Sequence, residues 1–129
     1  MKKRAKPIDY EKFCMEWYEA RGFMCGKTTN WTAYGKHDLW GFCDVLVLDR
    51  EGRASAIQVT DRAHLKEHMN KYATKAPTKK RIQALVARKV RCDMFICFKN
   101  KEGKPELLER YRYVRGGDYP ISVDREDIR

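Results

Sequence analysis

Residues 41–61 read GFCDVLVLDREGRASAIQVTD and hold two apolar runs separated by a short polar stretch. The run at 42–48 is rich in β-branched residues, and we expect it to form a buried strand. The run at 54–60 has the same character, and residues 49–52 (DREG) between the two have the composition of a turn. This stretch therefore predicts a β-hairpin at the centre of the fold.

Helical patterns lie on both sides of this hairpin. Apolar side chains recur at helical spacing over 9–21, where Asp9 can cap the helix and Gly22 can end it. After the hairpin, similar patterns cover 62–75 and 79–90, with Pro77 between them and Thr78 as a cap for the second.

Further strands are expected at both ends of the pattern. Residues 23–34 indicate an irregular strand and a loop, 35–41 a polar turn, and 93–99 and 107–115 two more strands. The order of one helix, three strands, two helices and two strands predicts an α/β fold. We expect a three-layer α/β/α sandwich around a mixed five-stranded sheet.

The length of 129 residues fits a single domain, with a basic arm at 1–7 and an irregular tail at 116–129. No apolar run approaches the roughly 20 residues that span a bilayer, and no apolar stretch follows the basic start. We therefore expect a cytoplasmic protein without membrane contact.

The five cysteines are odd in number and form no CxxC pair. Their spacing fits neither a disulfide framework nor a zinc site, so we expect free and mostly buried thiols.

The positive charge is concentrated in one segment. Of the net charge of +10, residues 62–91 carry +9, from ten lysines or arginines and the single acid Glu67. Such a segment attracts polyanions, of which nucleic acid is the commonest, whereas a solvated helix face usually mixes both signs. The alternatives are a plain solvated face, an acidic protein partner or a membrane surface. The residues expected to contact nucleic acid are Arg62, Lys66, Lys71, Lys75, Lys79, Lys80, Arg81, Arg88 and, from an earlier loop, Lys36.

Three polar residues interrupt the apolar strands of the central hairpin. Asp44 lies within the first strand, where a buried carboxylate is costly unless it is paired, hydrogen-bonded or bound to a metal. Gln58 and Thr60 lie two residues apart on the second strand and so share one face of it. Glu11 on the first helix offers a second acid, with Glu16 and Glu19 as alternatives.

These residues, in this order, resemble the PD-(D/E)XK nuclease superfamily and within it the archaeal-type Holliday junction resolvases. The interval from Glu11 to Gly22-Phe23, the basic loop at 36–38, the GFCD string that ends at Asp44 and the QVTDR string that begins at Gln58 carry the resemblance. The resemblance extends over about residues 9–99. The GFxD and IQVT strings also resemble small phage-encoded members, which implies a bacterial or phage-infected host cell. The resemblance implies a restriction-endonuclease-like fold and a homodimer.

The resemblance also implies a chemistry. It implies a DNA endonuclease that depends on Mg²⁺ or Mn²⁺, acts on branched or otherwise structured DNA, and needs no organic cofactor. Asp44, Gln58 and Glu11 would be the metal ligands, because Mg²⁺ prefers oxygen. Glu11, Asp44, Gln58, Thr60 and Lys71 are the expected catalytic residues.

The sequence departs from the family at its usual acid-x-lysine pair. Gln58 takes the place of the acid, as in the Mrr-type branch, and Thr60 takes the place of the lysine. His64, His68, Lys71 and Lys75 follow at helical spacing, and we hypothesise that Lys71 or Lys75 replaces the missing cation. The alternative is a nuclease-fold protein that has lost catalysis and only binds nucleic acid or a nucleoprotein complex.

Overall fold

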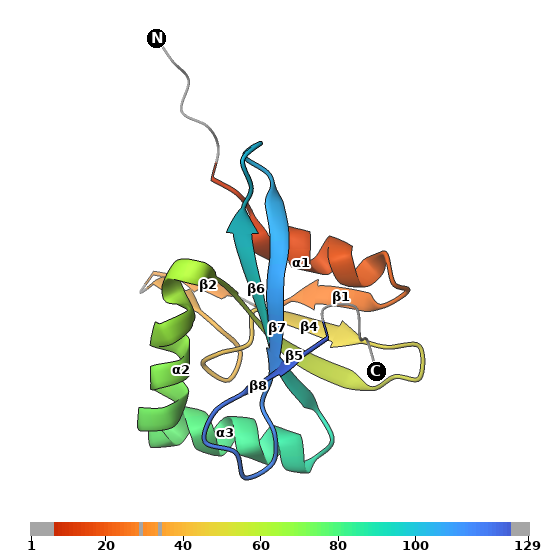
Figure 1. Cartoon of the computed structure of the whole chain (residues 1–129). Coiled ribbons are helices and arrows are strands. Elements are labelled where there is room, and N and C mark those ends of the chain that lie inside the picture. Colours follow the sequence, from red (N-terminus) through yellow and green to blue (C-terminus); the bar gives the residue numbers. More distant parts are fainter. Residues whose placement is uncertain (1–6, 29, 34, 125–129) are drawn as a thin grey trace.

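The computed structural model describes residues 7–28, 30–33 and 35–124. In this part of the chain an open, mixed six-stranded sheet, a separate two-stranded ribbon and three α-helices make up a mixed α/β structure (Figure 1). The predicted α/β class is confirmed, but the expected count of five strands is wrong. Apart from Pro7, the predicted basic arm lies outside the described residues, as does the end of the tail.

The large sheet has the strand order β1-β4-β5-β6-β7-β8. Strands β5 and β6 are parallel, and every other neighbouring pair is antiparallel. The central hairpin is present as predicted, since β4 and β5 pair antiparallel. In its turn, the Asp49 carboxylate accepts hydrogen bonds from the N–H groups of Glu51 and Arg53. The strands are β1 (Met24–Lys27), β4 (Val45–Leu48), β5 (Ala54–Asp61), β6 (Arg91–Lys99), β7 (Pro105–Arg112) and β8 (Ile121–Val123).

Three strand predictions need correction. The first hairpin strand starts at Val45, so Asp44 immediately precedes the strand instead of interrupting it. Strand β8 lies in the segment predicted as an irregular tail. The ribbon formed by β2 (Asn30–Thr32) and β3 (Gly35–His37) includes part of the predicted polar turn at 35–41. Strands of three residues are too short for an alternating pattern to show in the sequence.

The first helix, α1 (Tyr10–Glu19), begins and ends where local signals predict. The Asp9 carboxylate caps it by accepting a 3.0 Å hydrogen bond from the N–H of Lys12. After the helix, Gly22 adopts a φ of +88°, and the N–H of Phe23 donates to the carbonyl of Tyr18.

The segment between β5 and β6 contains a short 3₁₀ turn (Arg62–His64), α2 (Leu65–Thr74) and α3 (Ala76–Ala87). The predicted break falls at Lys75, two residues before Pro77, and Pro77 lies in the first turn of α3, where proline is tolerated. Thr78 lies inside α3 and does not cap it, which corrects the prediction.

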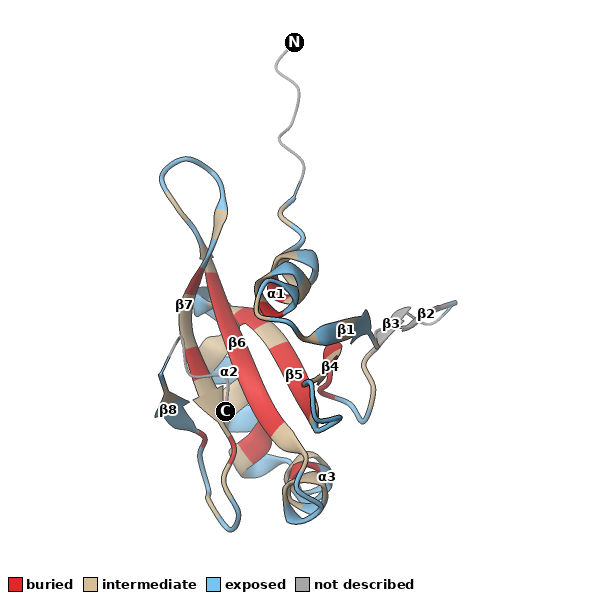
Figure 2. Ribbon diagram, turned by 90° about the vertical axis from the view of Figure 1, so that its right-hand side faces the viewer, coloured by how far each residue is buried: buried red, intermediate tan, exposed pale blue. Residues whose placement is uncertain are grey.

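Core residues form two clusters on opposite faces of the sheet. Alternate residues of β6 point to opposite faces, so Met94 joins one cluster and Phe95 the other. On the Phe95 side the sheet packs against Cys14 and Tyr18 of α1, and on the Met94 side against Tyr72 of α2 and Ile82 of α3. Figure 2 shows the buried residues along β4, β5 and β6. Within the described part of the chain, each helix lacks the length and apolar character needed to cross a bilayer.

The five thiols are free, as predicted. Four of them are buried, and Cys25 on the outer strand β1 is partly exposed. Burial raises the pKa of the Cys97 thiol to about 12, which keeps it protonated.

Candidate functional site

A cavity of about 440 Å³ lies beside the end of β5, and we call it the β5 cavity. The start of α1, the end of β1, the end of β5 and the start of α2 surround it. Elements far apart in the sequence therefore meet here. The polar residues that line it are Asp9, Glu11, Lys27, Thr60, Asp61, His64 and His68.

Asp44 is fixed beside β5 by its backbone and its side chain. The Asp44 N–H donates to the carbonyl of Ile57 at 2.8 Å, and the Asp44 carboxylate accepts from the N–H of Val59 at 2.8 Å. The carboxylate is buried, and the hydrogen bond offsets part of its desolvation cost. Because Val45 pairs with Ile57, one further step along the two strands brings Asp44 beside Gln58, as the hairpin predicted.

Gln58 is buried and faces α2. Its side-chain NH2 donates a 2.8 Å hydrogen bond to Nδ1 of His68, which accepts it when Nδ1 carries no proton. Burial lowers the pKa of His68, so the neutral imidazole is favoured. The contact joins β5 to the helix that carries much of the basic segment.

Glu11 lies in the first turn of α1 and lines the β5 cavity. Its side chain is only 17% exposed, and Oε2 lies 4.0 Å from Nζ of Lys27. Glu16 instead lies 4.0 Å from Lys12 in an exposed pair, and Glu19 is exposed. Of the three candidate helix acids, Glu11 is the one that lines the cavity.

Thr60 is buried at the cavity wall, two residues beyond Gln58. Next to it, the Asp61 carboxylate lies 2.7 Å from Nδ1 of His64 and accepts a hydrogen bond from the His64 N–H. The hydrogen bond that the protonated His64 ring donates to the Asp61 carboxylate raises the pKa of His64. Burial alone would raise the pKa of Asp61, but the His64 contacts outweigh it and the net shift is downward.

The predicted stripe of two histidines and two lysines divides between two hollows. His64 and His68 line the β5 cavity, whereas Lys71 and Lys75 line an open groove of about 810 Å³ between α2 and α3. The Lys71 ammonium donates to the carbonyl of Gly41 at 3.3 Å. In this structure neither lysine joins Glu11 and Thr60 at the cavity.

Lys27 is a cavity residue that the sequence analysis did not identify. It ends β1 and donates to the Asp9 carboxylate at 3.2 Å. The four-residue strand that carries it has no distinctive pattern, and only the pairing of β1 with β4 brings it here.

The donors for a metal ion are only partly assembled. Asp44, Gln58 and Glu11 offer oxygen atoms, which suit Mg²⁺ chemically. Within the described ranges, however, no group of three or more His, Cys, Asp or Glu side chains could hold a metal ion. Glu11 lines the cavity. Asp44 and Gln58 do not line it, but Asp44 is hydrogen-bonded to Val59, which does.

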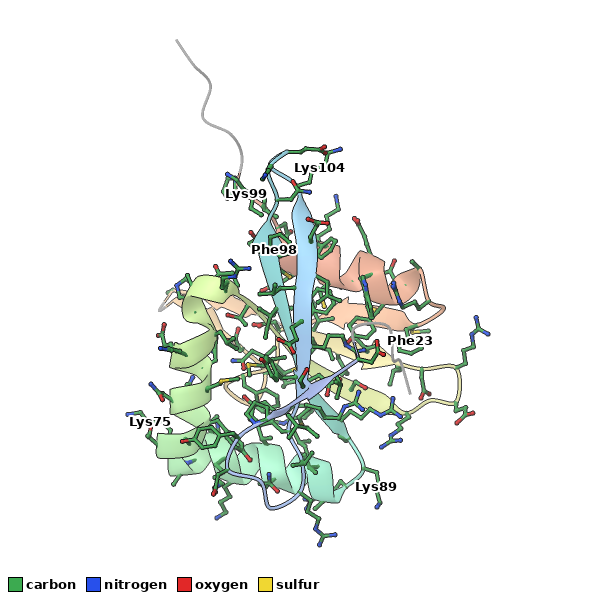
Figure 3. All side chains as sticks on the ribbon, in the orientation of Figure 1. Phe23, Lys75, Lys89, Phe98, Lys99 and Lys104 are labelled. Carbon is green, nitrogen blue, oxygen red and sulfur yellow. The ribbon has the colours of Figure 1, made fainter. Side chains whose placement is uncertain are left out.

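Most of the expected nucleic-acid contacts make up a basic surface on α2 and α3. We call the groove between these helices the basic groove; Lys66, Lys71 and Lys75 line it. Figure 3 shows Lys75 at the corner where α2 and α3 meet. Lys80, Arg81 and Arg88 are exposed on α3, and Lys79 donates to Asp118 at 2.6 Å.

Two further residues of the expected set lie elsewhere. The Arg62 guanidinium lies 5.8 Å from the ring centre of Phe98, on the strand next to β5. Lys36 lies on β3, and its side chain is outside the part that is described. Trp40, in the turn beside α3, is 39% exposed, and its carbonyl accepts a hydrogen bond from Arg81.

Comparison with known proteins adds no relative. No protein-family model matches the chain, and neither the search of curated proteins nor that of solved structures finds a match.

Proposed function

We propose that this chain is a restriction-endonuclease-like nuclease that binds DNA and hydrolyses its phosphodiester bonds with a divalent cation. The observation that carries the proposal is that Asp44 lies beside Gln58 on β5, next to the cavity that Glu11 lines. Asp44 is hydrogen-bonded to Val59, the neighbour of Gln58, and Glu11 lines the cavity that Val59 and Thr60 also line.

The fold supports the proposal. Strands β1, β4, β5, β6, β7 and β8 form a mixed sheet with α1 packed on one face and α2 and α3 on the other, which supports a three-layer arrangement. Strand β5 lies within this sheet, and Glu11 and Asp44 both precede it in the sequence, as in the order that the resemblance predicts.

The basic surface supports a polyanionic partner. Its lysines are exposed in the basic groove, and α2 separates that groove from the β5 cavity, with His64 and His68 on one side and Lys66 and Lys71 on the other. A phosphate backbone held along α2 would pass close to the cavity. Such binding weakens with salt, because each neutralised phosphate releases counterions.

In the proposed reaction a water oxygen bonds to phosphorus, one ester P–O bond breaks, and the leaving oxygen takes up a proton. Asp44, with Gln58 and Glu11, would hold the Mg²⁺ or Mn²⁺ ion. When bound, such an ion activates water and offsets the negative charge that develops on the phosphate. The chain itself fixes Asp44 through Ile57 and Val59 and lines the cavity with the Thr60 hydroxyl.

The second candidate is a protein of the same fold that binds DNA without cutting it. Thr60 favours this reading, since a buried hydroxyl brings no positive charge to the phosphate. For this second candidate, the basic groove binds DNA and the β5 cavity has no function.

One assay separates the two. Labelled duplex, flap and four-way DNA are incubated with the protein and Mg²⁺, alongside Asp44→Ala. Cleavage above the variant supports the nuclease. Salt-dependent binding with equal, background cleavage by both proteins would contradict it and support the second candidate. Mixing tagged and untagged chains in the same assay tests the expected homodimer.

A further inference from the structure

The negative charge of the β5 cavity disfavours a bound phosphate. Three carboxylates line it, those of Asp9, Glu11 and Asp61, and they would repel a phosphodiester. A phosphate can approach only where positive charge offsets them. Among the described residues that line the cavity, Lys27 is the only lysine or arginine.

The backbone around Lys27 is fixed beside Asp44. Lys27 pairs with Val45 across β1 and β4. The next residue, Thr28, donates its hydroxyl to the Cys43 carbonyl at 2.6 Å and its N–H to the Asp44 carbonyl at 3.0 Å. The lysine therefore starts from a defined position at the cavity edge.

The Lys27 ammonium is held by weak interactions that a phosphate can replace. It lies 3.2 Å from Asp9 and 4.0 Å from Glu11, and its side chain is 44% exposed. Ion pairs at this exposure are weak because water screens them, so they can be exchanged at little cost. A phosphate oxygen offers a stronger charge-assisted hydrogen bond.

We propose that Lys27 contacts the phosphate that is cleaved in the β5 cavity and supplies the positive charge that Thr60 lacks. The inference rests on the proposed hydrolysis. Lys27 keeps its proton throughout: the attacking oxygen and the leaving group are those of the overall reaction, and the ammonium stabilises the charge on the non-bridging oxygens. Lys27 and Thr60 line the same cavity from β1 and β5, so they can serve one phosphate.

The test compares Lys27→Met with Lys12→Met. Lys12 lies on α1, its 4.0 Å pair with Glu16 is exposed, and it does not line the cavity. We expect Lys27→Met to slow single-turnover cleavage on the order of 100-fold, as loss of one charge-stabilising donor does. Lys12→Met stays near wild type and Lys27→Arg loses less than Lys27→Met. Wild-type rates for Lys27→Met, or equal losses at both lysines, would overturn the proposal.

A second variant tests whether the two positions are equivalent. Adding Thr60→Lys to Lys27→Met restores the lysine at the position that the resemblance predicts, and we expect cleavage to recover at least tenfold over Lys27→Met. Thermal melts establish that each variant is folded. A folded double variant without recovery contradicts a shared phosphate.

A readout without metal separates this inference from the proposed function. In EDTA, the slope of log DNA affinity against log salt concentration should be smaller by about one unit for Lys27→Met than for wild type. If wild type does not cleave, the proposed nuclease fails and this slope alone decides the phosphate contact. If wild type cleaves, Asp44→Ala does not and Lys27→Met does, only the role of Lys27 is wrong.

Discussion

The carboxylate of Asp44 accepts a 2.8 Å hydrogen bond from the backbone N–H of Val59, between Gln58 and Thr60 on the neighbouring strand. This bond holds the acid that precedes β4 against the polar pair of β5. It gives Asp44 a structural role as well as the proposed metal-binding role, and substitutions can separate the two.

Two substitutions at Asp44 should differ in stability but not in activity. Asp44→Asn keeps an oxygen that can accept from Val59, whereas Asp44→Ala leaves that partly buried N–H without this acceptor and costs about 1–3 kcal/mol. Both remove the carboxylate and should abolish Mg²⁺-dependent cleavage. Urea unfolding and the cleavage assay measure the two effects, and a cleaving Asp44→Asn variant would exclude a role for the carboxylate in catalysis.

Removing the lysines of the basic groove should weaken DNA binding. The triple variant Lys66→Ala, Lys71→Ala, Lys75→Ala loses three exposed charges, so the slope of log affinity against log salt should fall by about 3. Fluorescence anisotropy with labelled duplex at several salt concentrations gives the slope.

The matched control changes Lys99, Lys101 and Lys104 to alanine. These lysines are exposed at the β6–β7 hairpin, where Figure 3 labels Lys99 and Lys104. An equal fall in slope for both triple variants would show that net charge, and not the basic groove, governs binding.

Asp93 should be the most costly acid to remove from the core. It is 1% exposed, and Arg112 holds it through bonds of 2.8 and 3.1 Å, with the buried Arg110 at 3.5 Å. Asp93→Asn leaves buried positive charge without its counter-charge, so we expect a loss of about 3–5 kcal/mol in urea unfolding. The control Asp118→Asn breaks an exposed pair with Lys79 and should cost much less. Equal losses would refute this account of the core.

His68 should make the fold less stable in mild acid. Burial lowers its pKa in the folded state below the ordinary value of 6.5. The folded state therefore binds fewer protons than the unfolded one, and the contribution of neutral His68 is complete above pH 6.5 and lost as pH falls through the lowered folded value. His64 and Lys71 also lower this pKa, while Glu67 and Asp38 act against the shift.

The comparison is with His68→Gln, measured by urea unfolding in EDTA from pH 7.5 downward. The stability advantage of wild type over the variant should shrink as the solution is acidified. An advantage that grows on acidification would mean that the histidine is charged when folded.

The sequence predicts elements that depend on local signals. The Asp9 cap, Gly22 and the apolar stripe define α1 within two residues, and the DREG turn defines the central hairpin. It also places Asp44 beside Gln58, because hairpin strands must pair.

What the sequence cannot predict depends on contacts between distant segments. Lys27 reaches the β5 cavity through the pairing of β1 with β4, which no local pattern encodes. The spacing of His64, His68 and Lys71 indicates one helical face. In the structure, the two histidines line the β5 cavity, whereas Lys71 lines the basic groove.

The most direct test of the account is a crystal soaked in Mn²⁺, with an anomalous difference map calculated around the end of β5. The account predicts an anomalous peak within coordinating distance of the Asp44 carboxylate, with Glu11 or Gln58 turned toward it, and no such peak in Asp44→Asn. A map without a peak at Asp44, from crystals in which Mn²⁺ binds elsewhere on the protein, would contradict it.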